Sequence, residues 1–286
     1  MRRNYPFVKM HGAGNDFVVM DARVPGFSMQ TIREKTPLLC NRRKGIGADG
    51  VLMLNHSSRA HFAMHYLNRD GSEAGMCGNG ARCLSRFAVD LGYPSKLQID
   101  VHGHEYQAEV HHGYVSIRFP VKPEPEKILI DDELWYKIRP GTEHVVRIDS
   151  EYSGQETAML GLKGKQIRNR TDLFPEGTNV NFSEIIHENH LKLYTYERGV
   201  EEITQACGTG AIAASIALDF QKANHAPNAT HREESDGVTE HHVQVDCPGG
   251  PLEVSFEAAR KNDKHIYQNI VLHGPAVSVY RGQILL

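Results

Sequence analysis

Two copies of one short cysteine motif are the residues of this chain best suited to chemistry. Cys77 opens the sequence Cys-Gly-Asn-Gly-Ala, and Cys207, 130 positions later, opens Cys-Gly-Thr-Gly-Ala. Apolar residues recur at helical spacing after each motif, so each cysteine is predicted to lie in a glycine-rich turn at a helix N-terminus. The N–H groups and partial positive charge of such a terminus bind anions and lower the pKa of a thiol. One such turn could hold a substrate carboxylate beside a thiolate base.

A pair of such turns suits one class of reaction. A thiolate on one face of a substrate can remove the proton from Cα, and a thiol on the opposite face can return one, which inverts the stereocentre. The sequence has no P-loop, no evident pyridoxal lysine motif and no G-x-G-x-x-G fingerprint after an expected strand. We therefore expect a mechanism that uses no cofactor.

Two other interpretations of the cysteines stay open. A free cysteine is commonly a small buried hydrophobic residue. The shared motif favours a function for Cys77 and Cys207, whereas Cys40, Cys83 and Cys247 lack it, and Cys83 is expected in the core. A functional alternative of a different class is a non-catalytic, redox-responsive protein whose two thiols join when they are oxidised.

The similarity between the two parts of the chain extends beyond the cysteines. At an offset of 130 residues, the matching pairs are Tyr66 and Tyr196, Gly78 and Gly208, Gly80 and Gly210, Ala81 and Ala211, and Ser85 and Ser215. This repeat predicts two related halves, each with one copy of a site. Short segments rich in apolar and β-branched residues predict many strands: DFVVMD, DGVLML, AHFAMHYL, GYVSIRF, EHVVRID, LKLYTYE, LEVSF and YQNIVLHG. The predicted fold class is therefore α+β, with few helices.

Composition excludes several classes of protein. The chain has 286 residues, of which 40% are hydrophobic and 23% charged, as in an ordinary globular protein of two domains. A net charge of -3 gives no attraction to nucleic acid or to anionic membranes. The first residues lack a signal-peptide pattern, and no run approaches the ~18 apolar residues of a membrane helix, so we expect a cytoplasmic protein. Five cysteines, an odd number, argue against a secreted disulfide framework.

Two polar stretches are predicted to lie outside the core. The proline-rich residues 120–126 (PVKPEPE) are expected to form a linker between the halves. Residues 221–242 are expected to form a surface loop. This segment contains His225, His231, His241 and His242, but they show no regular spacing to a carboxylate. We expect these histidines to be solvated, and we expect no metal site.

The whole sequence resembles the diaminopimelate epimerase family. The segments that carry the resemblance are KMHGAGNDFVVMD (9–21), GIGADGVL (45–52), NRDGSEAGMCGNGARC (68–83), GTNVNF (177–182), YERGVEEITQACGTGAIAA (196–214) and LHGPAVSVYRG (272–282). Two cysteine motifs and four further segments in the same order make this resemblance highly specific.

The resemblance implies a fold and an activity. It implies two pseudo-symmetric halves, each a β-sheet wrapped around a central helix, with the active site in the cleft between them. The expected halves are residues 1–122, joined by a C-terminal strand at 272–286, and residues 123–271. The implied activity is the cofactor-independent interconversion of LL- and meso-diaminopimelate, on the route to lysine and peptidoglycan. A small amino acid is then the substrate, and homodimer formation stays open.

The resemblance also implies roles for individual residues. Cys77 and Cys207 match the acid/base thiols, and His144 and Glu197 match polar catalytic residues near the thiols and the substrate amine. The positions that match the helix starts holding the reacting carboxylate are Gly78, Asn79, Gly208 and Thr209. The positions that match contacts to the distal end of the substrate are Asn15, Asn68, Asn179 and Arg198. A guanidinium suits that end because it can bind a carboxylate with two hydrogen bonds.

One segment departs from the family pattern. The family usually has Gly-Asn-Pro-His where this chain has Gly141, Thr142, Glu143 and His144. Thr142 replaces an amide that helps to hold the distal end, and a missing hydrogen bond to a charged group costs about 1.5–3 kcal/mol. Because specificity depends on such distal contacts, a racemase of another amino acid on the same scaffold stays an alternative.

Overall fold

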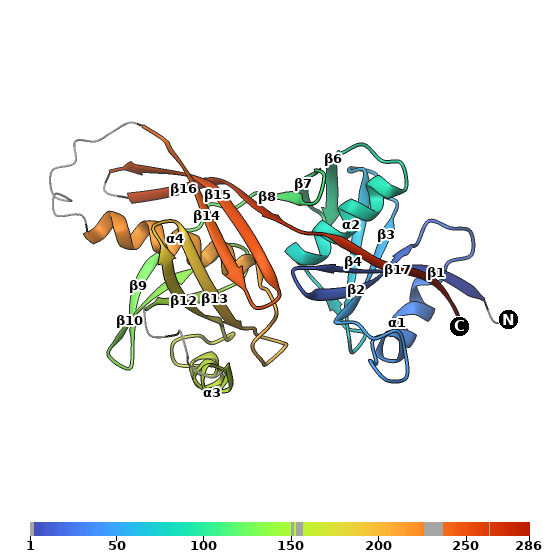
Figure 1. Cartoon of the computed structure of the whole chain (residues 1–286), viewed down its shortest axis with the longest axis horizontal. Helices are drawn as coiled ribbons and strands as arrows, with labels where there is room; N and C mark the ends of the chain where they lie inside the picture. The colour runs from blue at the N-terminus through green and yellow to red at the C-terminus, as the bar shows by residue number, and fades with distance from the viewer. Residues whose placement is uncertain (1–2, 150–151, 153–156, 226–236, 263) are drawn as a thin grey trace. The chain divides into compact units, whose positions relative to one another are not determined.

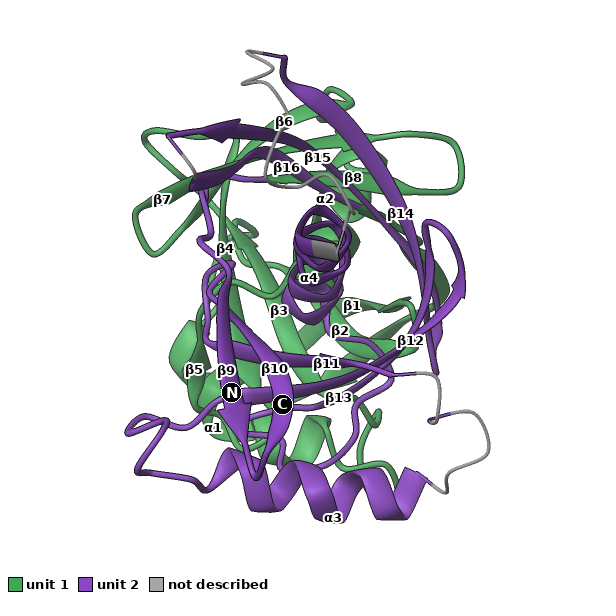
Figure 2. Cartoon of the chain, turned by 90° about the vertical axis from the view of Figure 1, so that its left-hand side faces the viewer, with its two compact units in different colours: residues 1–118, 273–286 green, residues 119–272 purple. Residues whose placement is uncertain are grey.

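The chain folds into two compact units that together contain four helices and seventeen strands among the described residues. The computed structural model describes residues 3–149, 152, 157–225, 237–262 and 264–286. The first unit comprises Met1–Arg118 and His273–Leu286, and the second comprises Phe119–Leu272 (Figures 1 and 2). The chain therefore passes from the first unit to the second just before the proline-rich residues 120–126.

Each unit combines two helices with strands that pair mainly in sequence order. The elements of the first unit are β1 (Asn4–Gly12), β2 (Asn15–Asp21), α1 (Met29–Leu39), β3 (Gly50–Asn55), β4 (Phe62–Asn68), β5 (Glu73–Ala74), α2 (Gly78–Asp90), β6 (Lys96–Val101), β7 (His104–Val110), β8 (Val115–Phe119) and β17 (Val277–Leu285). The elements of the second are β9 (Glu126–Ile130), β10 (Glu133–Ile138), β11 (His144–Ile148), α3 (Thr157–Arg168), β12 (Asn179–His187), β13 (His190–Tyr196), α4 (Gly208–His225), β14 (Thr239–Cys247), β15 (Gly250–Lys261) and β16 (Lys264–Gly274).

The two units repeat the same order of strand pairings. In the first unit, β1–β2 is antiparallel, β2–β3 parallel, β3–β4 antiparallel, β4–β6 parallel and β6–β7 antiparallel. In the second unit, β10–β11, β11–β12, β12–β13, β13–β14 and β14–β15 follow the same sequence of directions. The helices take matching places in this order, α1 with α3 and α2 with α4. The predicted α+β fold of two related halves is confirmed.

A buried helix lies at the centre of each unit. Helix α4 contacts strands β10 to β15, which curve around it in Figure 2, and helix α2 contacts β1, β2, β3, β4 and β7. Residues 211–218 of α4 are all at most 1% exposed. A helix that is apolar on all sides is stable in water only when other elements enclose it. The alanine-rich sequence after Cys207 therefore requires the surrounding strands.

The repeated serines make the same contact in both central helices. Ser85 Oγ donates to the carbonyl of Ala81 at 2.7 Å, and Ser215 Oγ donates to the carbonyl of Ala211 at 2.9 Å. Both serines are fully buried. A hydroxyl bonded to the carbonyl four residues earlier satisfies its own polarity inside the helix. The repeated serines therefore allow both helices to be enclosed on every side.

Several predicted boundaries were wrong. Helices α1 and α3 were not predicted from the sequence. The loop expected at 221–242 is shorter, because α4 continues to His225 and β14 begins at Thr239. Residues 226–236, which include His231, lie outside the described residues. Within the described residues, no helix is long and apolar enough to span a membrane.

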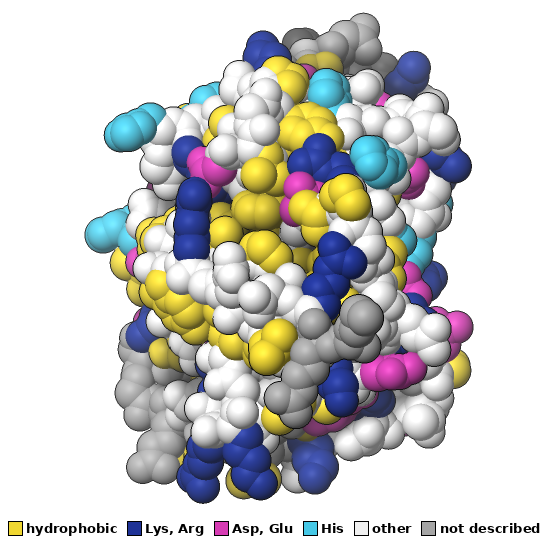
Figure 3. All heavy atoms as spheres, turned by 90° about the vertical axis from the view of Figure 1, so that its right-hand side faces the viewer, with side chains coloured by type: hydrophobic (Ala, Val, Ile, Leu, Met, Phe, Trp, Pro, Cys, Tyr) yellow, Lys and Arg dark blue, Asp and Glu magenta, His cyan; other side chains and the backbone are white. Residues whose placement is uncertain are grey.

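Hydrophobic side chains also reach the surface of the first unit. The face drawn in Figure 3 shows them interspersed with charged groups. On β17, the exposed apolar residues are Val277, Val279, Tyr280 and Leu285. A folded protein has too little polar surface to cover itself completely, so scattered exposure of this kind is ordinary.

The first turn of α4 provides a test of this packing. A Cβ added to Gly210 would lie 2.6 Å from Asn181 Oδ1 and 2.9 Å from Thr195 Oγ1. We predict that Gly210→Ala lowers the free energy of unfolding, measured by urea denaturation, by about 1–3 kcal/mol, because buried side chains must shift. In Gly161→Ala, a control in α3, the new methyl would meet only Ile203 Cγ1, at 4.0 Å, and should not destabilise the protein. Equal stability of the two variants would contradict the packing described.

Candidate active site

Cys77 caps the central helix of the first unit. It has extended backbone angles just before α2, and its Sγ accepts a hydrogen bond from the backbone N–H of Gly80 at 3.4 Å. The sulfur thus occupies the place where a serine or aspartate oxygen usually caps a helix. Gly78 and Asn79 follow it and are buried. The structure therefore places the Cys77 thiol at the positive end of a helix, as the motif predicted.

Asn15 and Asn79 lie beside this thiol. Asn15 Oδ1 lies 4.0 Å from Cys77 Sγ and accepts a hydrogen bond from Asn79 Nδ2 at 3.3 Å. Arg82, fully buried in α2, donates to Asn79 Oδ1 at 2.8 Å, which fixes the orientation of that amide. The fold thus brings Asn15, from the segment at 9–21, into one cluster with Cys77 and Asn79 of the first cysteine motif.

A network of charged side chains holds Asn15 in place. Asn15 Nδ2 donates to Asp49 Oδ2 at 2.8 Å, and Arg42 links Asp49 to Asp16 with hydrogen bonds of 2.8 and 2.7 Å. Lys9 also pairs with Asp16. Burial raises the pKa of Asp16, but hydrogen bonds from Arg42 and Lys9 outweigh that effect and lower it to about 2. Asp16 is therefore ionised at neutral pH, which keeps this network charged.

Asn68 is positioned differently from the other predicted residues of the first unit. It ends strand β4, and its Nδ2 donates to Ser72 Oγ at 3.0 Å. Ser72 in turn donates to Asp70 Oδ1, so the three residues form a local turn. The structure thus engages the Asn68 amide in this turn rather than in the cluster around Cys77.

Cys207 lies directly before α4 in the second unit. It is only 6% exposed, and its Sγ lies 3.5 Å from Thr209 Oγ1. Its carbonyl accepts from the backbone N–H of Ala211 at 2.9 Å, which is the first hydrogen bond of the helix. Gly208, the next residue in the chain, is also buried. The second motif therefore reproduces the helix-start position of the first.

The protonation of Cys207 differs from the sequence-based expectation. Burial raises the pKa of this thiol well above its usual value, and the carboxylate of Glu197 raises it further. Hydrogen bonds from Thr209 and from the backbone of Gly210 lower it, but by less. The lowering expected at a helix N-terminus is thus outweighed by desolvation of the thiolate. In the unliganded protein Cys207 is a thiol.

His144 lies close to Cys207 and is neutral. It is the first residue of β11 and fully buried, and its Nε2 lies 2.9 Å from Thr209 Oγ1 and 3.1 Å from Thr142 Oγ1. Burial lowers the pKa of His144 to about 3, and the charge of Arg198 contributes in the same direction. Thr142, the departure from the family pattern, is therefore bonded to the imidazole.

Asn179 and Arg198 lie on the same side of this cluster. Asn179 Oδ1 accepts from the backbone N–H of Arg198 at 2.9 Å, and Asn179 Nδ2 lies 3.3 Å from His144 Nε2. The guanidinium of Arg198 donates to the carbonyl of Glu176 at 2.7 Å. A fork with five N–H donors keeps others available when one carbonyl is bound. The Arg198 guanidinium is therefore suited to binding an anion.

Several polar residues of the site were not singled out from the sequence. Asp49 and Asn181 lie inside the segments GIGADGVL and GTNVNF, but nothing in the spacing of those segments shows which side chains meet. Arg82 likewise lies inside the segment NRDGSEAGMCGNGARC, whereas Arg42 lies outside all the quoted segments. Glu143, which replaces the usual proline, lies 3.7 Å from Lys137 Nζ.

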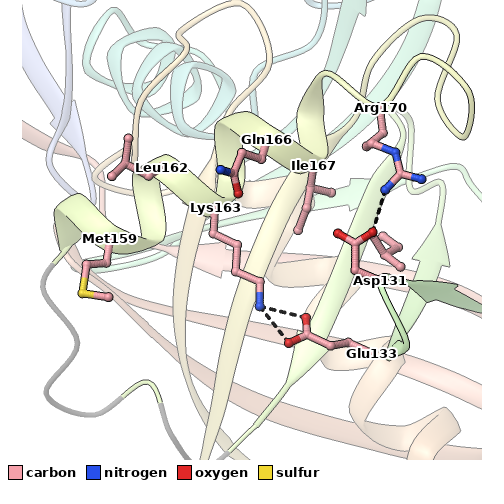
Figure 4. Close-up of a pocket in the computed structure, with 9 residues that line it drawn as sticks. Asp131, Glu133, Met159, Leu162, Lys163, Gln166, Ile167 and Arg170 are labelled. Atoms are coloured by element: carbon pink, nitrogen blue, oxygen red, sulfur yellow. Dashed lines mark hydrogen bonds and ion pairs between the residues drawn. The ribbon is translucent and has the colours of Figure 1, made fainter.

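Other parts of the molecule offer weaker candidate sites. A cavity of about 290 Å³ lies between α3 and the β9–β10 hairpin, and none of the predicted site residues lines it (Figure 4). Its charged residues pair with one another, Lys163 with Glu133 and Arg170 with Asp131. The residues described by the structure contain no cluster of three side chains that could hold a metal ion. The N-termini of α2 and α4, with Cys77 and Cys207, therefore remain the candidate site.

Comparison with known proteins identifies relatives over nearly the whole chain. The family model described as "Diaminopimelate epimerase" matches residues 7–117 and 136–279. The chain is 35% identical over 284 residues to a diaminopimelate epimerase of Chlorobaculum tepidum, covering 97% of this chain and 100% of that protein. It is 33% identical over 302 residues to one of Caldanaerobacter subterraneus, covering 97% and 98%.

Solved structures with low sequence identity share the fold. A Bacillus anthracis phenazine biosynthesis protein of the PhzF family matches with a TM-score of 0.69 and 12% identity, covering 99% of this chain and 100% of that one. A hydroxyproline epimerase from Agrobacterium vitis matches with a TM-score of 0.68 and 14% identity, covering 100% and 94%. At these identities the likeness establishes the fold alone.

The network around Asp16 predicts a dependence of stability on pH. The pKa of Asp16 is lowered from 3.8 to about 2 in the folded protein, so its stabilising effect is complete above about pH 4 and is lost as the pH falls through about 2. We predict that Asp16→Asn flattens this part of the acid-unfolding profile, measured by circular dichroism. Asp132→Asn, at an exposed aspartate, is the control and should keep the wild-type slope. An unchanged slope in Asp16→Asn would show that Asp16 does not carry this stabilisation.

Proposed function

The chain belongs to the diaminopimelate epimerase family, and from this premise we propose that it interconverts LL- and meso-diaminopimelate by moving the Cα proton between two cysteines without a cofactor. The family consists of isomerases. The proposed place of the reaction is the route to lysine and peptidoglycan.

One observation carries this proposal. In each unit, a cysteine sulfur lies at the start of an enclosed helix, with Asn15 and Asn79 beside Cys77 and Thr209 beside Cys207. A structural cysteine in a core is a small buried hydrophobic residue, and Cys83 in α2 is fully buried. Cys77 instead meets Asn15, and Cys207 meets Thr209. These polar surroundings favour thiols that exchange protons.

The proposed mechanism uses each helix start in two ways. The backbone around Gly78 and Asn79, and that around Gly208 and Thr209, would hold the carboxylate of the reacting carbon, since helix N-termini bind anions. One thiolate would remove the α-proton, and the opposite thiol would deliver a proton to the other face of the carbanion. The proton count is balanced, because one cysteine gains the proton that the other loses.

The raised pKa of Cys207 has a consequence for this cycle. In the unliganded protein, the carboxylate of Glu197 is one cause of that raised pKa. A bound substrate would bring an ammonium group, whose positive charge offsets Glu197 and favours the thiolate. Substrate binding would therefore prepare Cys207 to act as a base, while the free protein keeps a less reactive thiol.

The test of this function replaces each cysteine in turn. We predict that Cys77→Ala and Cys207→Ala each lower turnover of LL-diaminopimelate by about 100-fold or more, as expected when an acid or base is removed. Turnover is followed as loss of the α-proton NMR signal in deuterated water. Cys83→Ala is the matched control, because it removes a thiol from the same helix as Cys77 without touching the motif.

Three outcomes separate this function from its alternatives. Turnover of diaminopimelate that is lost in both motif variants supports the proposal. Turnover of another amino acid from a panel of single L-amino acids would identify a racemase and would assign the Thr142 change to specificity. No turnover of any substrate, together with reversible disulfide formation, would favour the redox-responsive alternative.

Arg198 provides a separate test of substrate recognition. We predict that Arg198→Gln raises KM for diaminopimelate by about 10-fold or more, because a charge-assisted hydrogen bond to the distal carboxylate contributes about 1.5–3 kcal/mol. The alkylation rates of Cys77 and Cys207 should change far less than KM. An unchanged KM would show that Arg198 does not bind the substrate.

A further inference from the structure

Asn181 is a fully buried amide of β12 whose orientation is fixed by its neighbours. Its Nδ2 donates to the carbonyl of Val145 at 2.9 Å, and its Oδ1 accepts from Thr195 Oγ1 at 2.9 Å. A backbone carbonyl can only accept a hydrogen bond, so the atom that faces it must be the amide nitrogen. The reverse orientation of this side chain would place two oxygens against each other.

This orientation determines the tautomer of His144. Asn181 Nδ2 lies 3.1 Å from His144 Nδ1, which has no other hydrogen-bond partner among the described residues. One hydrogen of Nδ2 is bound by Val145, and the other lies nearer to His144 Nδ1 than to the carbonyl of Asn179, which is 3.5 Å away. Because Nδ2 can only donate, Nδ1 accepts and carries no hydrogen. His144 is neutral, so its one ring hydrogen is on Nε2. The hydroxyl oxygens of Thr209 and Thr142 lie nearest to Nε2 and can accept this hydrogen.

A second amide, that of Asn179, does not alter this assignment. Asn179 Nδ2 also lies near His144 Nε2, at 3.3 Å. The two hydrogens of that amide have their own acceptors, the carbonyl of Glu143 at 3.2 Å and Thr142 Oγ1 at 3.3 Å. Asn179 therefore does not require Nε2 to act as an acceptor.

The tautomer in turn sets the direction of the hydrogen bond to Cys207. With the hydrogen on Nε2, Thr209 Oγ1 accepts from His144, and the hydroxyl hydrogen of Thr209 is left for Cys207 Sγ at 3.5 Å. With the opposite tautomer, Nε2 would accept that hydroxyl hydrogen, and the Thr209 oxygen would face the sulfur with its lone pairs. Donation to sulfur stabilises a thiolate, whereas lone pairs favour a thiol.

The first unit shows that the fold does not require this arrangement. A Cβ on Gly210 in α4 would meet Asn181 and Thr195, whereas a Cβ on Gly80 in α2 would meet the apolar side chains of Leu52 and Met64. The same place beneath the first helical turn is thus polar in one unit and apolar in the other. Burying polar groups costs free energy unless all are hydrogen-bonded, so the polar pair is not needed for packing.

We propose that Asn181 is a positioning residue for catalysis: by donating to His144 Nδ1 it holds the Nε2–H tautomer, which directs the Thr209 hydroxyl toward Cys207 and stabilises the thiolate. The role rests on the proposed function, because it matters only if Cys207 exchanges protons. The other titratable groups that act on Cys207 are Glu197 and Cys247, and both raise its pKa. The Thr209 contact is therefore one of the few influences that favour the thiolate.

The first experiment reads the tautomer directly. In ¹⁵N-labelled protein, long-range ¹⁵N–¹H correlation spectra distinguish a protonated Nε2 from a protonated Nδ1. We expect His144 to be the Nε2–H tautomer in the wild type and to become a mixture, or the Nδ1–H tautomer, in Asn181→Ala. The control is Ser183→Ala, two residues further along β12, which removes a fully buried hydroxyl that has no hydrogen-bond partner among the residues the structure describes. A wild-type Nδ1–H tautomer, or an unchanged tautomer in Asn181→Ala, would overturn the proposal.

The second experiment measures the thiol. The rate of alkylation of Cys207 is followed against pH by mass spectrometry of its peptide, without substrate. We expect the midpoint of this profile to rise by about one to two pH units in Asn181→Ala and in Thr209→Val, since a hydrogen bond to a charged group is lost. Ser183→Ala should keep the wild-type midpoint. Thr209→Val tests the same contact if Asn181→Ala does not fold, and an unshifted midpoint in a folded variant would overturn the proposal.

These readouts separate this proposal from the proposed function. Neither needs substrate, so a protein with no epimerase activity would still show whether Asn181 controls the tautomer and the thiol. Conversely, the protein could be an active epimerase in which Asn181→Ala changes neither the His144 tautomer nor the Cys207 midpoint. That result would leave the proposed function standing and refute only the proposed role of Asn181.

Discussion

The constraint on which the rest of the structure depends is the enclosure of a thiol at the start of a helix that must itself be buried. Residues 211–218 of α4 are almost wholly inaccessible, so the strands have to wrap around the helix and thereby fix its N-terminus. The sulfur of Cys207 is held at that fixed point and loses water. The same arrangement in the first unit places Cys77 at the start of α2. Stability and chemistry thus arise from one feature.

The two helix starts are alike in backbone but differ in their surroundings. Cys77 lies beside amides that are held by ion pairs, whereas Cys207 lies beside a neutral imidazole and hydroxyl groups, with a carboxylate acting on it. The two faces of a stereocentre do not need to be served by two identical acid/base groups. The duplicated fold supplies a second helix start, and different side chains surround each thiol.

The motifs, the two central helices and the repeated halves could be predicted from the sequence. The regular spacing of apolar residues indicates helices, and short segments rich in apolar and β-branched residues indicate strands. Helix α3 was missed because Gly161 and Gly164 weaken its helical pattern, although a Cβ added to Gly164 would lie only 2.5 Å from Tyr196 Cβ. Pro37 obscured α1 in the same way. Asp49 and Asn181 could not be selected, because their partners lie on other strands. The pKa of Cys207 depends on burial, which spacing does not reveal.

The most direct measurement of the central claim is the early isotope distribution when LL-diaminopimelate is turned over in deuterated water. Two cysteines on opposite faces predict that the meso product carries deuterium at the inverted carbon from the first turnovers, while recovered LL substrate stays protiated. Mass spectrometry of the two separated isomers gives both values. Product that retains the original proton, or substrate that gains deuterium as fast as the product, would show that one base serves both faces and would contradict the account.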